Sequence, residues 1–281
     1  MKISPEQIDQ SLPAKINTKE AVGLVEEKQE ETDSILPPRC DDDAANKRID
    51  KVLDMDYIVD NLKVFSYSVK ELIRSFARLV IELEDKIPFY DTIISDDVGG
   101  RLVSLFLKRV IDKKKAELNE KSTSVFFIAS GRKDGRKNNE VINNFIIENK
   151  KIFGRVLVVT EYIETGFSIK SIADKLEEQN IEFDIAALSI SPDNNYLDSS
   201  DPDSNIDHDL WRYLKKKLKY GGMGYVGYSF SKRSPLGIKK DDNINVHPIK
   251  NKEINQSSIN MARRDIEFLA DEISKLILEK K

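Results

Sequence analysis

The residues best suited to chemistry in this sequence follow a buried, β-branched run near its centre. Arg155 to Thr160 predicts a strand and Ser168 to Gln179 a helix, joined by a turn that contains Glu164-Thr165-Gly166-Phe167-Ser168. Glycine lets the backbone approach a ligand closely, and a helix start presents free N–H groups and the positive end of a dipole. The Thr165 and Ser168 hydroxyls add donors. This combination predicts an anion site suited to a phosphate.

Two further polar segments follow apolar runs. Residues 91 to 100 read Asp-Thr-Ile-Ile-Ser-Asp-Asp-Val-Gly-Gly, a strand pattern that ends in an acidic turn and paired glycines, with Arg101 just beyond. The segment Gly131 to Lys137 places basic residues between two glycines, after the run that ends at Ala129. Its flexibility and charge suit a lid over an anionic ligand, although basic clusters also form ordinary solvated loops. Both interpretations of the basic segment stay open.

The elements that must position these segments alternate between strands and helices, as in an α/β protein. Short apolar runs predict four strands: Thr92 to Ser95, Ser124 to Ala129, Arg155 to Thr160 and Asp184 to Ile190. Helical stretches separate them: Gly99 to Leu118, Asn139 to Lys151 and Ser168 to Gln179. Strand starts recur at about thirty residues, the length of a βαβ unit, so a twisted parallel sheet with helices on both faces is expected. Ligands bind beyond the carboxyl ends of such strands.

Helical additions flank this core at both ends. Val64 to Ile87 and Ile259 to Leu278 repeat apolar residues every three or four positions, as amphipathic helices do. Leu210 to Tyr220 predicts a short basic helix before the turn Gly221-Gly222. Residues 1 to 50 are charged and poor in aromatics, which predicts a disordered arm. The domain then spans 51 to 281, with its core at about 91 to 190 and a hood and C-terminal helix within 191 to 281.

Composition narrows the class of protein. The chain has 281 residues and a net charge of -4, which argues against a nucleic-acid binder because such proteins carry excess Lys and Arg. Cys40 is the single cysteine and the chain has two histidines, so neither an internal disulfide nor a zinc site is expected. His208 and His247 are expected on the surface, in polar loops. No apolar run is long enough to span a membrane, and a cytoplasmic location is expected.

The segment Thr160 to Ser168 resembles the signature of the type I phosphoribosyltransferases. That signature is a strand, two adjacent acidic residues, two variable residues, an acidic residue, Thr-Gly, a variable residue, and Thr or Ser. The resemblance implies that Glu161 holds the ribose hydroxyls of phosphoribosyl pyrophosphate (PRPP) and that Glu164 acts as a general base. It places the 5'-phosphate on Thr165, Gly166, Phe167 and Ser168. Two departures stand out: Thr160 replaces the first acidic residue, and Phe167 is bulky.

The same resemblance assigns roles to the other two segments. The earlier one is similar to the family's pyrophosphate loop, which implies substrate contacts from Asp97, Gly99, Gly100 and Arg101. Arg132 and Lys133 stand where the family's mobile loop brings a basic residue to the pyrophosphate. Mg²⁺ is implied as a cofactor, and would bridge the extra carboxylate of Asp96 to the ligand. The implied partner is PRPP or a nucleotide-like small molecule, and a homodimer is compatible with the sequence.

The leading hypothesis is therefore a magnesium-dependent transferase of nucleotide metabolism, which moves a phosphoribosyl group to a nitrogen acceptor. The alternative is a catalytically silent sensor or interaction module on the same fold, which the two departures favour. A third hypothesis, an accessory protein that uses its long helices as interfaces, has no specific support. Aromatic residues after the core could form a hood that stacks on a nucleobase or a satellite core: Trp211, Tyr225, Tyr228 and Phe230.

Overall fold

Five short apolar runs, rich in β-branched residues, form the strands of one parallel sheet. The structure is a computed structural model and describes residues 43–62, 69–96, 100–128, 135–163, 166–191, 213, 216–222, 238–240, 246–248 and 256–278. All of them belong to one compact unit, Ser34–Lys281. The strands are β1 (Thr92–Asp96), β2 (Ser124–Ile128), β3 (Val156–Ile163), β4 (Phe183–Ile190) and β5 (Leu218–Tyr220). Their order is β2-β1-β3-β4-β5, and every neighbouring pair is parallel.

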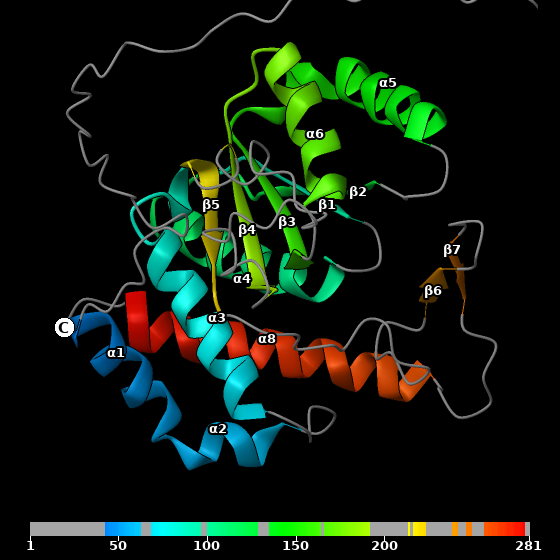
Figure 1. The fold of residues 1–281 in the computed structure, drawn as a ribbon. Coiled ribbons are helices and arrows are strands. Elements are labelled where there is room, and N and C mark those ends of the chain that lie inside the picture. The colour runs from blue at the N-terminus through cyan, green and yellow to red at the C-terminus, as the bar shows by residue number, and fades with distance from the viewer. Residues whose placement is uncertain are drawn as a thin grey trace, which may run out of the picture. The chain divides into compact units, whose positions relative to one another are not determined.

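Helices connect and flank these strands (Figure 1). The connecting helices are α4 (Arg101–Glu117), α5 (Gly135–Phe153) and α6 (Phe167–Glu178). The flanking helices are α1 (Asp43–Leu53), α2 (Asp56–Asn61), α3 (Val69–Leu83) and α8 (Gln256–Leu278), with a 3₁₀ turn at Ile87–Phe89. A separate two-stranded antiparallel sheet pairs β6 (Ile238–Lys240) with β7 (Val246–Pro248). Within the described residues, no helix is long and apolar enough to cross a membrane.

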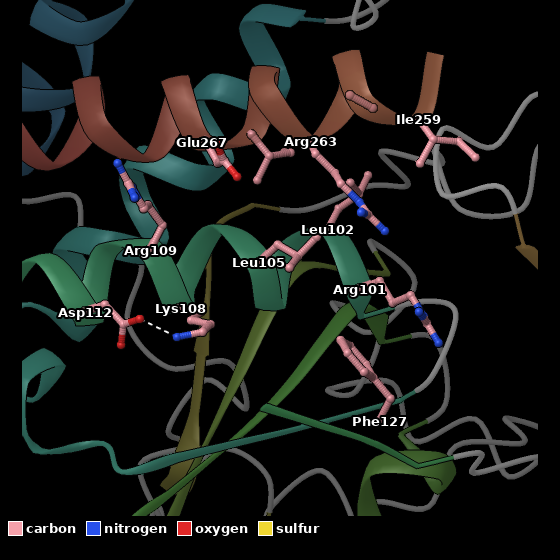
Figure 2. A pocket seen from close by; sticks show the side chains of 12 residues that line it. Arg101, Leu102, Leu105, Lys108, Arg109, Asp112, Phe127, Ile259, Arg263 and Glu267 are labelled. Atoms are coloured by element: carbon pink, nitrogen blue, oxygen red, sulfur yellow. Dashed lines mark hydrogen bonds and ion pairs between the residues drawn. The ribbon is translucent and has the colours of Figure 1, made fainter. Parts of the chain in front are cut away.

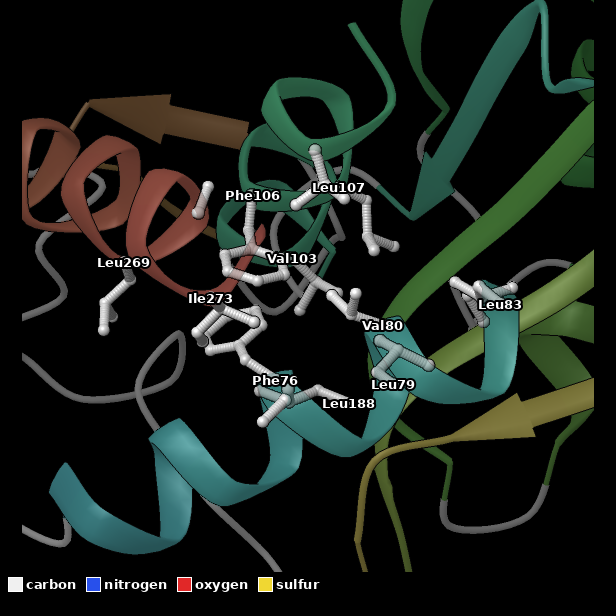
Figure 3. Close-up of a cluster of buried hydrophobic side chains, with 14 of the residues drawn as sticks. Phe76, Leu79, Val80, Leu83, Val103, Phe106, Leu107, Leu188, Leu269 and Ile273 are labelled. Carbon is white, nitrogen blue, oxygen red and sulfur yellow. The ribbon is translucent and has the colours of Figure 1, made fainter. Parts of the chain in front are cut away.

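The alternating side chains of β3 divide the core into two layers. Leu157 and Val159 join a cluster with α1, α3, α4 and α8 on one face of the sheet, whereas Val156 and Val158 join α5 and α6 on the other. Figure 3 shows the first layer, where the α3 ring of Phe76 packs against the α4 ring of Phe106 with centroids 4.0 Å apart. Both faces of the sheet are therefore covered, as a parallel sheet requires.

The connecting helices stop at residues that tolerate a left-handed backbone. Asn119 follows α4, Gly154 follows α5 and Asn180 follows α6, with φ values of 57°, 57° and 56°. Glycine and asparagine adopt this conformation at the lowest cost, and it ends a helix by turning the chain away from its axis. At Gly154 a side chain would also collide with that of Asp91. These three turns bring the chain back to the amino ends of β2, β3 and β4.

The α/β fold with a parallel sheet and helices on both faces is confirmed, and three local predictions need correction. The predicted basic helix at Leu210 to Tyr220 is wrong at its end, because Leu218–Tyr220 forms β5 and pairs with β4. The predicted arm at residues 1 to 50 ends earlier, because α1 begins at Asp43 and buries Ala45 and Ile49. His247 lies in β7 rather than in a loop. Residues 1–42, which include Cys40, lie outside the described part of the chain.

A buried carboxylate ties together the amino ends of three strands. Asp184, the second residue of β4, accepts hydrogen bonds from Lys86 Nζ at 2.8 Å, Tyr90 Oη at 2.9 Å and Arg155 Nη2 at 3.2 Å. Burial raises the pKa of Asp184, but these hydrogen bonds and the charges of Lys86 and Arg155 more than offset it, so the pKa is lowered. Burial and the Asp184 charge raise the pKa of Tyr90, which therefore remains a donor.

Because the folded-state pKa of Asp184 lies below its ordinary value, its stabilisation is present above about pH 4 and is lost as the pH falls through the folded-state pKa. Asp184→Asn should lower the free energy of unfolding by about 1–3 kcal/mol at neutral pH, since buried donors lose a charged acceptor. Urea unfolding measured from about pH 7 to about pH 2 should show the difference shrinking with acid. The control is Asp174→Asn, which breaks an exposed i,i+4 pair with Lys170 and should cost at most about 0.5 kcal/mol. Equal losses for both variants would contradict the assignment.

A second prediction concerns the turn after β5. A side chain at Gly221 would collide with the backbone carbonyl oxygen of Ser75 in α3, whereas a Cβ at Gly222 would lie 2.8 Å from the Ser75 hydroxyl, which can rotate. Gly221→Ala should therefore lower the free energy of unfolding by about 1–3 kcal/mol, as overpacking does. Gly222→Ala should cost clearly less. Urea midpoints of the two variants test this, and a ranking in the opposite order would show that α3 does not approach β5 so closely.

Candidate functional site

The direction of the chain across the sheet reverses between β1 and β3, and open α/β sheets have a crevice at the carboxyl ends of such a pair of strands. From β1 the chain passes through α4 to β2 on one side, and from β3 it passes through α6 to β4 on the other. The buried face of α4 joins the first core layer and that of α6 joins the second, so the two helices leave the sheet on opposite faces. Such a topological switch point is where ligands bind in open α/β sheets. The starts of α4 and α6, which follow β1 and β3, therefore lie at the same edge of the sheet.

Gly166 opens α6 on the β3 side of this crevice. Its φ of 80° is left-handed, and its carbonyl oxygen accepts the first helical hydrogen bond from Lys170 N at 2.9 Å. The N-cap makes no side-chain hydrogen bond, and the first turn of α6 contains no acidic residue. The first N–H groups of α6 are therefore not capped by the residue before them, and the helix dipole favours an anion here. This confirms the strand, glycine turn and helix expected from the sequence.

The neighbouring residues of this turn differ in exposure. Phe167, the first residue of α6, is 49% exposed, and Ser168 is half-buried. Glu164 and Thr165, the predicted base and one predicted phosphate donor, lie outside the described residues.

Gly100 opens α4 on the β1 side. It has φ -93° and ψ -4°, and its carbonyl oxygen accepts a hydrogen bond from Ser104 N at 2.8 Å. Like Gly166, it makes no side-chain cap. Two helix starts, each preceded by a glycine, therefore follow the adjacent strands β1 and β3. Asp97 and Gly99 lie outside the described residues, and Asp96 is the last residue of β1.

Arg101 lies at the start of α4, as predicted, and its guanidinium carbon lies 4.6 Å from the ring centroid of Phe127. Phe127 is in β2, next to its carboxyl end, and pairs with Ser95 of β1. The sequence analysis missed Phe127. Its position two residues before the end of a predicted strand, at the edge where ligands bind, was the signal that could have identified it.

Glu161 lies inside β3 rather than after it, as does Thr160, the predicted last residue of the strand. The strand was predicted to end at Thr160, but it continues to Ile163, past Val159, the last residue paired with β1. Thr160 is 4% exposed and Glu161 is 3% exposed. Both side chains are therefore largely covered within the strand, rather than presented on an open turn after it.

The basic segment is described only in part. Arg132 and Lys133 lie outside the described residues, whereas the helix α5 begins at Gly135, so Arg136 and Lys137 belong to its first turn. The lid predicted for this segment therefore stays a prediction. The residues expected in a hood, Trp211, Tyr225, Tyr228 and Phe230, and also His208, lie outside the described part of the chain.

A metal ion would find only part of a binding site in the described residues. Among them there is no group of three His, Cys, Asp or Glu side chains that could hold an ion. Mg²⁺ often uses one or two carboxylates and completes its shell with water and substrate phosphates. The carboxyl-end residues Asp96 and Glu161 are of the donor type that this ion prefers, so the residue types fit an ion that arrives with a diphosphate.

Comparison of the sequence with models of protein families and with curated proteins finds no match.

The conformation of the two glycines gives a testable difference. Gly166→Ala forces a Cβ into a left-handed backbone and should lower the free energy of unfolding by about 1–2 kcal/mol. Gly100→Ala is the matched control, because its backbone already has right-handed helical angles that alanine adopts without strain. The measurement is the urea midpoint of each variant. Equal losses would mean that the left-handed angle at Gly166 is not what determines the effect.

Proposed function

We propose that this protein binds PRPP or a nucleotide 5'-phosphate in the crevice between β1 and β3, as a phosphoribosyltransferase-like protein. The observation that supports the proposal best is the pairing of two glycine-preceded helix starts across a topological switch point. The 5'-phosphate would lie on the N–H groups that open α6, and the pyrophosphate on those that open α4. The sequence resemblance assigns the same two segments to the same two groups.

As an enzyme, the protein would transfer the phosphoribosyl group to a nitrogen acceptor and release pyrophosphate. The acceptor nitrogen forms a bond to the anomeric carbon while the bond from that carbon to the pyrophosphate oxygen breaks, and the acceptor proton passes to a base. Glu164 is the candidate base and Glu161 the candidate ribose anchor. Bound Mg²⁺ would neutralise charge on the departing pyrophosphate. The chain's own contribution is then orientation and electrostatic stabilisation by the two helix starts.

A second candidate, a sensor that binds the same ligand without turnover, is favoured by the position of Glu161. A carboxylate that is 3% exposed within β3 presents little surface to ribose hydroxyls. The residue at the family's first acidic position is Thr160, a neutral side chain whose hydrogen bonds are about half as strong as those of an ionised acceptor. Both features weaken ribose binding without touching the phosphate site at α6.

The decisive experiment combines binding with turnover. The full chain is mixed with PRPP, Mg²⁺ and a panel of nucleobases; pyrophosphate is measured by mass spectrometry and ligand binding by thermal shift. An enzyme releases pyrophosphate only with an acceptor present. A sensor is stabilised by PRPP or by a nucleoside monophosphate and releases none. If neither ligand shifts the melting temperature and no pyrophosphate forms, the proposal is wrong.

The phosphate position is tested by a pair of serines in α6. Ser168→Ala removes a hydroxyl from the first turn and should raise the Kd for the bound phosphate ligand about tenfold, the value of one charge-assisted hydrogen bond. Ser171→Ala removes an exposed hydroxyl that bonds only to the Phe167 carbonyl oxygen at 3.2 Å and should change Kd less than about twofold. Similar effects of both substitutions would contradict a phosphate at the start of α6.

A further inference from the structure

A pocket of about 600 Å³ lies between α4 and α8 (Figure 2). Its apolar lining comes from both helices and from β2: Leu102, Leu105, Phe127, Ile259, Ala262 and Ile266. Pockets that bind small molecules measure roughly 300–1,000 Å³ and combine an apolar lining with a few polar groups. This pocket has the size and lining of a small-molecule site.

Charged side chains are unevenly distributed along the pocket. Four basic and two acidic residues line it, which leaves an excess of two positive charges. At one end Lys108 pairs with Asp112, and Arg109 makes two hydrogen bonds to the Asp271 carboxylate, at 2.9 and 3.0 Å. The second acidic lining residue, Glu267, also lies toward this end (Figure 2). Positive and negative charges therefore nearly balance here.

At the other end of the pocket, the charged lining residues are two arginines, Arg101 and Arg263. In Figure 2 the exposed side chain of Arg263 extends from α8 toward the first turn of α4, where Arg101 lies over the ring of Phe127. Neither acidic lining residue is at this end. Two guanidinium groups beside apolar Leu102 and an aromatic ring suit a ligand that carries an anionic group on an apolar ring system.

We propose that the α4–α8 pocket is a binding site for a small organic anion with an aromatic or alicyclic body, next to the proposed pyrophosphate position, with which it shares Arg101. The carboxylate, sulfonate or phosphate group would lie between Arg101 and Arg263, and the body would pack on Leu102, Leu105 and Ile266. The pocket lining includes neither Gly166 nor Ser168, so this assignment does not depend on the 5'-phosphate site. Because Arg101 is common to both proposals, the experiment is made at Arg263, which the proposed function does not use.

The experiment uses 8-anilinonaphthalene-1-sulfonate as the probe, a ring system with one anionic group, in fluorescence titrations of the full chain. Arg263→Gln should raise its Kd about tenfold, because it removes one charged partner of the sulfonate. Arg264→Gln is the matched control: Arg264 is also exposed on α8, has the same charge, and does not line the pocket. Arg264→Gln should change the Kd less than about twofold. It removes the same net charge as Arg263→Gln, so it measures how much of the effect comes from net charge alone.

Two further titrations keep the result unambiguous. Leu105→Glu places a negative charge in the half-buried lining and should raise the Kd of the anionic probe at least about tenfold. Thermal melting checks that the variant is folded. N-phenyl-1-naphthylamine, which lacks the sulfonate, should bind Arg263→Gln and the parent chain equally. Failure of the anionic probe to bind saturably, or equal effects of the two arginine substitutions, would overturn the proposal.

Discussion

Parallel sheets are covered on both faces, because their strands are apolar on both sides. The way in which this chain covers the two faces determines where a ligand can bind. β1 lies between β2 and β3, and the helices that follow β1 and β3 pack on opposite faces because the first fills the layer of Phe76 and Phe106 and the second fills the layer of Val156 and Val158. The position of the topological switch point thus follows from how the two core layers are filled.

The local chemistry of the sequence was enough to predict most of this framework. The β-branched runs predicted β1 to β4, with the largest error at the carboxyl end of β3. The predicted helix ends at Leu118 and Gln179 were each within one residue, because an asparagine that adopts a left-handed backbone follows. β5 was missed because it has three residues and lies in a lysine-rich run, where its neighbours in space, not its own pattern, make it a strand. The helix α1 was missed because its buried stripe of Ala45, Ile49 and Val52 follows a long charged segment.

The candidate site was less predictable than the fold, for a reason that β3 illustrates. A sequence motif gives spacing along the chain, whereas the site depends on where the strand ends and which side chains it buries. The strand β3 continues through Thr160 and Glu161 and buries both, which the spacing of the motif did not indicate. Gly166 was predictable because its role depends on local backbone angles. The contact of Arg101 with Phe127 joins residues from two elements, and neither element's pattern alone contains it.

The amino and carboxyl edges of the sheet differ in how strongly the structure constrains their residues. At the amino edge, few substitutions or changes in loop length are compatible with the structure. Three turns need a left-handed backbone, Gly154 lies close to the Asp91 side chain, and the Asp184 carboxylate is buried. At the carboxyl edge, α4 and α6 each follow a glycine that provides no side-chain cap. The N–H groups in the first turn of each helix can be satisfied by a side chain, by water or by a ligand. Substitutions can therefore accumulate at the carboxyl edge without unfolding the protein, so a lineage carrying this chain could change what it binds while its amino edge holds the framework unchanged.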